Sequence, residues 1–280
     1  MHLDAFRIDT YEVTNKQFKD YILSVGRMLP YAWVSSGYAI SENQLNMLDI
    51  EKLHKMVMDV FAIDADTQEM DKKTLISMML QKQQAQDDYP VTGVNWFMAK
   101  EFCAWRNARL PSEAEWEKAA RGTDGRFFPW GNSPITPEKA RYRQSWTEEI
   151  AHRVMVPVNS MPEGKSQYGL FHMLGNVKEW VDDWYDREYY KEENHNLNPK
   201  GQIGGEFKVL KGGSWRDLRS FIYASFRNNS YPNMVMDDYG FRCAQDGPDG
   251  SAPKRLTSLE HSLIPVRWQP SAQGGSGHNP

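Results

Sequence analysis

Cysteine is scarce in this sequence: its 280 residues contain only Cys103 and Cys243, and no CxxC spacing occurs. A single pair excludes a disulfide framework and a zinc site built on clustered thiolates. The pair could form one bridge. The favoured interpretation is that both are buried thiols that pack as small hydrophobic side chains.

Long apolar runs and basic clusters are also lacking. No stretch approaches the ~20 apolar residues that a membrane helix needs, so no membrane span is expected. The 33 Lys and Arg residues stand against 37 Asp and Glu residues, a formal charge of −4, and no basic run stands out. This argues against a nucleic-acid partner. The N-terminal MHLDAFRIDTYEV has no signal-peptide pattern, which predicts a cytoplasmic protein unless an N-terminal segment is missing.

Aromatic residues, in contrast, are abundant, with 10 Trp, 13 Tyr and 12 Phe. A chain of this length can bury a substantial core without disulfides or metals. Large aromatic packing units favour a compact fold over a disordered chain or a plain helical bundle.

The first part of the chain carries clear signals for local structure. Residues 3–13 alternate apolar and polar side chains, which predicts a strand. Thr14 or Asn15 then caps a helix that ends near Gly26. Residues 41–86 contain neither Gly nor Pro and predict two or three amphipathic helices, with candidates at Asp49–Phe61 and Asp71–Gln84.

Two further helices follow, and then the pattern changes. Asn95 is expected to cap one helix, and Ser112 with Glu115 forms a capping box for the next, which ends at Gly122. Residues 123–245 predict loops, glycine turns and short strands, and residues 246–280 predict a poorly ordered tail. The expected architecture is therefore one irregular α+β domain over residues 1–245, with 41–86 as a helical excursion.

Eight short motifs occur in one order and together resemble the formylglycine-generating-enzyme, or sulfatase-modifying-factor, family across about residues 3–245. They are IDTYEVTN (8–15), PVTGVNW (90–96), RLPSEAEWE (109–117), FPWGN (128–132), YGL (168–170), GNVKEW (175–180), KGGSW (211–215) and GFRC (240–243). Any one of them would be a weak signal. The resemblance implies a C-type-lectin-like fold with little regular secondary structure, in which 41–86 is an insertion. A Met-rich helical face can serve a partner, although packing on its own domain is the favoured alternative.

The resemblance also implies a reaction for which this chain lacks the residues. Sulfatase-activating members of the family hold copper between two cysteines after the GGS motif and use oxygen to convert a substrate cysteine to formylglycine. Soft thiolates suit Cu(I). Here Trp215–Arg227 contains no cysteine, and Asp217 and Ile222 stand near the expected positions, so copper is not expected. The iron-dependent sulfoxide synthases of the family need clustered histidines, whereas the seven histidines here are scattered.

Calcium is a possible cofactor by the same resemblance. Relatives bind calcium in a loop that matches residues 172–179, and the carry-over gives carbonyl ligands from Leu174, Gly175 and Val177 and a carboxylate from Glu179. His172 replaces the first side-chain oxygen ligand and is a poor substitute. The alternative is a structural turn whose Glu179 caps local N–H groups.

Candidate catalytic residues are Ser214, Asp217, Arg219 and Arg227, on the segment that faces the pocket in relatives. An aspartate flanked by arginines could position an anionic substrate or act in acid/base catalysis. A loop-organising Asp–Arg pair is the favoured alternative. Glu12 and Arg242 are expected to be buried partners of each other.

Three functions are compatible with these residues. The favoured one is a binding or accessory/maturation module, with an unknown protein or small-molecule partner. The alternative is an oxidative enzyme with a non-cysteine site that uses Asp217 and Tyr223. Formylglycine generation by Cys103 and Cys243 brought together is the least favoured. Fold alone cannot choose among them.

Overall fold

The computed structural model describes residues 1–27, 29–143, 155–191, 196–247 and 263–266. Helices precede most of the strands along the described chain, as predicted for an irregular α+β domain. The helices are α1 (Asn15–Val25), α2 (Tyr31–Ser35), α3 (Glu42–Asn46), α4 (Ile50–Asp59), α5 (Lys72–Gln84), α6 (Trp96–Trp105) and α7 (Glu113–Arg121), with short 3-10 turns η1 (Pro162–Gly164), η2 (Tyr189–Lys191) and η3 (Arg219–Phe221).

Two small sheets organise the body of the molecule. β1 (Phe6–Asp9) lies between β6 (Ala244–Asp246) and β7 (Leu263–Val266), antiparallel to both. The second sheet has the order β4-β3-β2-β5, built from β4 (Asn228–Ser230), β3 (Lys208–Lys211), β2 (Lys178–Trp184) and β5 (Tyr239–Phe241). In this sheet β2 pairs parallel with β5 and antiparallel with β3. Both sheets therefore join segments from distant parts of the sequence.

The predicted helix boundaries are confirmed by their caps. Thr14 and Ser112 each close a capping box, and Asn95 accepts a hydrogen bond from the backbone N–H of Met98. α1 ends at Gly26 in the left-handed region, with φ 65°, where the absence of a Cβ makes the conformation inexpensive. The first strand is shorter than expected, because only Phe6–Asp9 of residues 3–13 pairs as a strand.

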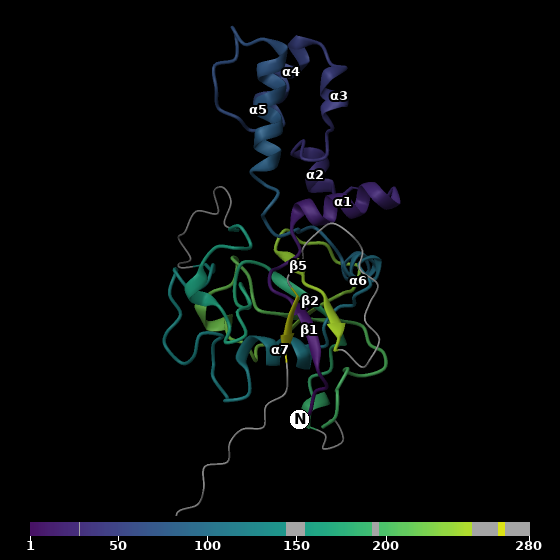
Figure 1. Cartoon of the computed structure of the whole chain (residues 1–280), viewed down its shortest axis with the longest axis vertical. Helices are drawn as coiled ribbons and strands as arrows, with labels where there is room; N and C mark the ends of the chain where they lie inside the picture. The colour runs from purple at the N-terminus through teal and green to yellow at the C-terminus, as the bar shows by residue number, and fades with distance from the viewer. Residues whose placement is uncertain (28, 144–154, 192–195, 248–262, 267–280) are drawn as a thin grey trace, which may run out of the picture.

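Residues 41–86 form a helical excursion with a core of its own. Figure 1 shows α3, α4 and α5 standing off one end of the molecule, beyond α1 and α2. Their buried residues make a separate cluster, of Leu45, Leu53, Val57, Phe61, Leu75, Ile76 and Met79. The helices at Asp49–Phe61 and Asp71–Gln84 are thus confirmed as α4 and α5, and they pack mainly on each other.

The expected tail over 246–280 needs a correction. Leu263–Val266 is strand β7 and pairs with the whole of β1, and Asp246 ends β6. The exposed backbone edge of β1 explains why a late segment can add there, since unpaired N–H and C=O groups of an edge accept a further strand. The remaining residues of the predicted tail, 248–262 and 267–280, lie outside the described residues.

The body carries two aromatic-rich cores, one on each side of the second sheet's central strands. One surrounds Trp116, which is fully buried, and the other surrounds Phe18, Phe102 and Trp180. Neighbouring residues Trp180 and Val181 on β2 belong to different cores, as alternation of side chains along a strand requires. No helix of the described chain is long and apolar enough to cross a bilayer.

Candidate functional site

The segment Trp215–Arg227 begins just after β3 and the Gly212-Gly213 turn. Gly213 has φ 70°, and a Cβ built on it would lie 2.5 Å from Ile222 Cδ1 and 3.5 Å from Asp217 Oδ2. The absence of a side chain at Gly213 therefore makes room for both neighbours. Asp217 and Ile222, which stand near the expected positions of a cysteine pair, meet over this glycine.

Asp217 belongs to a buried ionic cluster rather than to an open acid/base site. Lys178 Nζ lies 2.8 Å from Asp217 Oδ2 and 2.8 Å from Asp238 Oδ2. Ser214 is fully buried, and its hydroxyl contacts Asp238 at 2.7 Å and Lys178 at 3.1 Å. The Ser214 backbone N–H also donates to Asp217. These contacts fix the turn after the glycines.

The protonation of this cluster follows from its composition. Burial alone would lower the pKa of Lys178, but the carboxylates of Asp238 and Asp217 outweigh burial and raise the pKa above its usual range. Lys178 therefore stays an ammonium ion across the neutral range and cannot act as a base toward Ser214. The cluster is suited to holding the loop rather than to nucleophilic catalysis.

The predicted residues Arg219 and Arg227 do not join this cluster. Arg219 opens η3 with an exposed side chain. Arg227 makes a bidentate pair with Glu113 at the start of α7, with N–O distances of 2.7 and 2.8 Å, and donates to the Asp186 carbonyl. Burial alone would lower the pKa of Arg227, but Glu113 outweighs it and raises the pKa. The four candidates thus divide between a buried Asp–Lys cluster, an Arg–Glu pair and the surface.

The polar side chains of the predicted calcium turn already have protein partners. Glu179 is fully buried, and Arg242 donates to both of its carboxylate oxygens at 2.7 Å. Trp116 Nε1 donates to one of these oxygens as well. The neighbouring Asn176 side chain is bonded to Glu12 and to Val156. Calcium held by Leu174, Gly175, Val177 and Glu179 stays a prediction, and Glu179 would have to bind the cation while it is paired with Arg242. No group of three or more His, Cys, Asp or Glu residues suited to a metal occurs in the described part of the chain.

Glu12 and Arg242 lie in one buried network, but they are not each other's direct partners. Arg242 pairs with Glu179, and Glu12 accepts from Asn176 at 2.8 Å. Burial and then the Glu179 charge raise the pKa of Glu12 well above its usual range, against the opposing effects of Arg242 and Asn176. The expected ion pair is therefore corrected to Arg242–Glu179, with Glu12 beside it.

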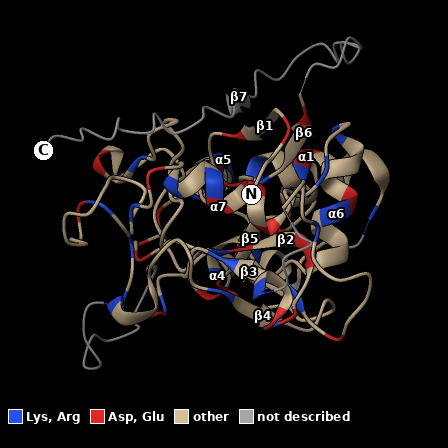
Figure 2. Cartoon of the chain, turned by 90° about the horizontal axis from the view of Figure 1, so that it is seen from below, with Lys and Arg blue, Asp and Glu red and all other residues tan. Residues whose placement is uncertain are grey.

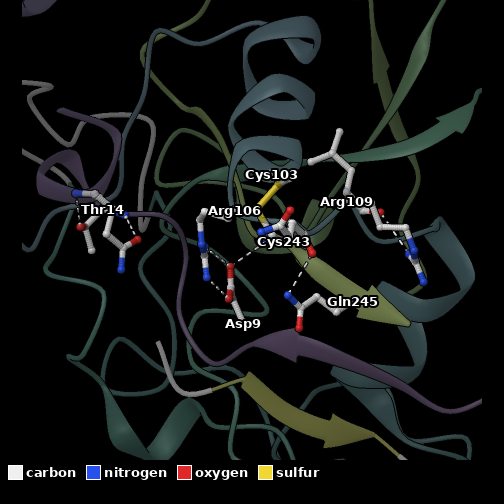
Figure 3. Close-up of a disulfide and its surroundings, with 10 residues drawn as sticks. Asp9, Thr14, Cys103, Arg106, Arg109, Cys243 and Gln245 are labelled. Atoms are coloured by element: carbon white, nitrogen blue, oxygen red, sulfur yellow. Dashed lines mark hydrogen bonds and ion pairs between the residues drawn. A yellow bond between two sulfur atoms is a disulfide. The ribbon is translucent and has the colours of Figure 1, made fainter. Parts of the chain in front are cut away.

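The two cysteines are joined, contrary to the favoured interpretation of two free thiols. Cys103 on α6 and Cys243 after β5 form a disulfide with a Cα–Cα distance of 5.6 Å, and both residues are fully buried (Figure 3). In the same view Arg106 pairs with Asp9, whose carboxylate also accepts the Cys243 N–H. The bridge is possible because α6 packs on the core beside β5, which sequence spacing could not reveal.

Comparison with known proteins gives the chain its family. Residues 1–247 match the model of the sulfatase-modifying factor enzyme 1-like domain. The chain belongs to this family. The predicted resemblance and the α+β, C-type-lectin-like fold class are thereby confirmed.

Curated relatives are identical to this domain at about a third of the aligned residues. The formylglycine-generating enzyme of Bos taurus is 31 % identical over 261 residues, which cover 87 % of this chain and 66 % of that protein. The serine/threonine-protein kinase Pkn1 of Chlamydia trachomatis is 33 % identical over 248 residues, covering 87 % of this chain and 34 % of the kinase. The chain thus spans about two thirds of the mammalian enzyme and a third of the kinase.

Solved structures of similar shape cover just over half of the chain. Treponema denticola variable protein 1 has a TM-score of 0.47 and 24 % identity, over 58 % of this chain and 73 % of that one. PvdO from Pseudomonas aeruginosa has a TM-score of 0.47 and 26 % identity, over 57 % of this chain and 63 % of that one.

Sequence reasoning missed the residues that hold the predicted site in place. Lys178 lies inside a quoted motif, but its partners Asp217 and Asp238 come from later segments. The sequence did carry one signal for Lys178, which is a charged residue in the same strand as the buried Trp180 and Val181. Because charged side chains almost never enter a core unpaired, a lysine at this position needs an acidic partner. Glu113 gave a similar signal at the start of α7, where it is buried against Arg227 and Lys211.

Proposed function

We propose that this domain does not generate formylglycine with copper and acts as a binding or accessory module built on the sulfatase-modifying-factor scaffold. The observation that carries the proposal is the state of its cysteines. The sequence holds only two, both lie outside Trp215–Arg227, and they are bonded to each other in the core. No thiolate pair is left to take up Cu(I) at the segment after the GGS motif.

The contacts around Asp217 support the same proposal. Its carboxylate is paired with Lys178, and Ile222 beside it is buried. An ion pair and an aliphatic side chain supply neither a soft metal ligand nor a redox-active group. An oxidative mechanism that uses Asp217 would first have to break its contact with Lys178.

One named relative is compatible with this assignment. The mouse protein called inactive C-alpha-formylglycine-generating enzyme 2 is 34 % identical over 168 residues, covering 56 % of this chain and 49 % of that protein. We infer by analogy that a member of this family can keep the scaffold without the activity. The partner would be a protein or a small molecule rather than nucleic acid, in keeping with the formal charge of −4.

The disulfide bears on the compartment in which the domain works. Structural disulfides persist in oxidising environments and are rare in reducing ones. The buried Cys103–Cys243 bridge therefore supports a proposal that the domain folds in an oxidising compartment, in place of the cytoplasmic location expected from the sequence.

A peptide assay tests the proposed function. The oxidised chain is incubated with copper, oxygen, a reductant and a peptide that contains Cys-X-Pro-X-Arg, the disulfide is verified as intact after the reaction, and the peptide is followed by mass spectrometry. We expect the peptide mass to stay that of the thiol. The Bos taurus enzyme, assayed in parallel, serves as the positive control. Catalytic conversion of the peptide cysteine to an aldehyde by this chain would refute the proposal.

A further inference from the structure

Strand β1 is paired on both sides, but its two neighbours differ in origin. Figure 2 shows β6, β1 and β7 together at one side of the body. β6 lies within residues 1–247, which match the family model, whereas β7 lies beyond them. Without β7, the described part of the family domain has no strand on the outer edge of β1. The strand that covers this edge is therefore an addition to the domain.

The outer edge of β1 is suited to accept a strand. Its register with β7 runs without a shift from Phe6 to Asp9, and β1 contains no proline. The Asp9 carboxylate is already held by Arg106 and by the Cys243 N–H. Proline and bulges, two devices that usually protect an open edge against a further strand, are therefore lacking in β1.

β7 has the properties of an occupant that can be displaced. It is four residues long, and Pro265, which stands opposite Arg7, has no backbone N–H to donate. Residues 247–262 connect β6 to β7. Fully extended they would reach about 50 Å, whereas the two strand ends are only about 14 Å apart across the sheet. The connection therefore does not force β7 onto β1, and so short a strand is marginal by itself.

The register indicates which segments this edge selects. Ile264 stands opposite Ile8, and Val266 stands opposite Phe6. An incoming residue directly opposite Phe6 or Ile8 shares their face of the sheet, and both belong to the buried core around Trp116. The edge therefore favours a strand with apolar, preferably β-branched, residues at two positions that are two apart, and it tolerates proline between them.

We propose that the outer edge of β1 is a strand-addition site for an extended segment of a partner protein, and that Leu263–Val266 occupies this site in cis. The partner segment runs antiparallel to β1, carries apolar residues two positions apart and competes with β7. Main-chain hydrogen bonds supply its affinity, and the alternate side chains supply its specificity. The proposal goes beyond the proposed function and does not depend on it, because β1 pairs with β6 and β7 rather than with Trp215–Arg227.

A partner segment fits this edge better than a second copy of the chain. Each copy already holds its own β7 as a tethered strand, at the high effective concentration that a covalent connection gives. Exchange of β7 between two copies would form the same pairs with β1 and bring no new contact. A different protein with a longer or better matched apolar segment would add pairs that Leu263–Val266 does not provide.

Fluorescence anisotropy with the full chain tests the proposal. The probe is a labelled peptide with the sequence of residues 262–267, Ser-Leu-Ile-Pro-Val-Arg. It is titrated with the parent chain and with an Ile264→Gly/Val266→Gly variant, in which glycine weakens β7. We expect the variant to bind the peptide about tenfold more tightly than the parent, because the peptide must displace the tethered strand from the parent. A peptide with glycine in place of isoleucine and valine should not bind.

A matched variant and hydrogen exchange locate the binding site. Leu256→Gly/Thr257→Gly also introduces two glycines into the sequence before residue 280 but outside β7, and it should bind the peptide as the parent does. In the Ile264→Gly/Val266→Gly variant the peptide should slow amide exchange at Phe6–Asp9. If that variant does not fold, excess peptide added to the parent should speed amide exchange in β7 while Phe6–Asp9 stays protected.

Three outcomes overturn the proposal. The first is that the peptide binds neither chain, or binds the parent and the Ile264→Gly/Val266→Gly variant equally well. The second is that the peptide changes amide exchange neither at Phe6–Asp9 in the variant nor in β7 of the parent. The third is that the variant dimerises as its concentration rises and the peptide does not suppress the dimer, which would assign the edge to a second copy of the chain.

Discussion

Loss of the Cys103–Cys243 bridge is expected to lower the free energy of unfolding by about 5 kcal/mol, the chain-entropy figure for a loop of this length. The bridge connects residues separated by 140 positions, and both cysteines are fully buried beside Phe102 and Phe241. It therefore restricts a large part of the unfolded chain and also joins α6 to the segment after β5. A loss of this size is comparable to the whole stability of many domains.

Denaturant unfolding of the Cys103→Ala/Cys243→Ala variant measures this effect. The midpoint should fall strongly relative to the oxidised parent chain. Because the sequence has no other cysteine, a thiol reductant provides an internal control: it should destabilise the parent and leave the double variant unchanged. Equal midpoints for the parent with and without reductant, after full reduction is verified by thiol counting, would contradict the prediction.

Arg242→Met is the second change with a large expected effect, a destabilisation of about 3–5 kcal/mol. Arg242 and Glu179 are both fully buried and form a bidentate pair. The guanidinium also donates to the carbonyls of Asp9, Thr10 and Phe171. Methionine keeps the apolar stem but leaves Glu179 as a buried charge without its cation and removes the hydrogen bonds that Arg242 donates to these carbonyls.

The exposed pair of Arg27 and Glu101 offers a matched control. Its side chains are 59 % and 48 % exposed, so Arg27→Met should change stability by no more than about 1 kcal/mol. Combining Arg242→Met with Glu179→Gln should recover part of the loss, because the uncompensated charge is then removed. If Arg242→Met is as mild as Arg27→Met, the buried pair does not hold the core together.

Local signals in the sequence predicted much of the helical structure. Thr14, Asn95 and Ser112 each cap the helix expected of them, because a cap depends on groups within one turn of the chain. The insertion was predicted for a similar reason, since residues 41–86 lack Gly and Pro and carry a helical periodicity.

Long-range contacts were not predictable from one sequence. Cys103 meets Cys243, Lys178 meets Asp217, and Arg242 chooses Glu179 over Glu12. Each pairing depends on how distant segments meet in the fold, and for Lys178 and Arg242 several carboxylates were chemically suitable partners.

The eight family motifs gave information that neither local helix signals nor long-range contacts provided. The eight motifs identified the scaffold, because they reflect turns and buried polar groups that the fold requires in a fixed order. The motifs alone do not decide the chemistry, and Trp215–Arg227 contains no cysteine, which is the basis of the proposal that this domain works without copper. Scaffold and activity are therefore separate inferences for this chain.

Anaerobic titration of the oxidised chain with Cu(I), against a chromophoric competitor ligand, tests most directly whether this scaffold lacks the copper site. The double variant Asp217→Cys/Ile222→Cys, which places two thiols over Gly213, serves as the comparison. We predict that the parent chain leaves the competitor complex unchanged and that the double variant withdraws copper from it. Uptake of one equivalent of Cu(I) by the parent chain, with its disulfide intact, would contradict the proposal that the domain works without copper.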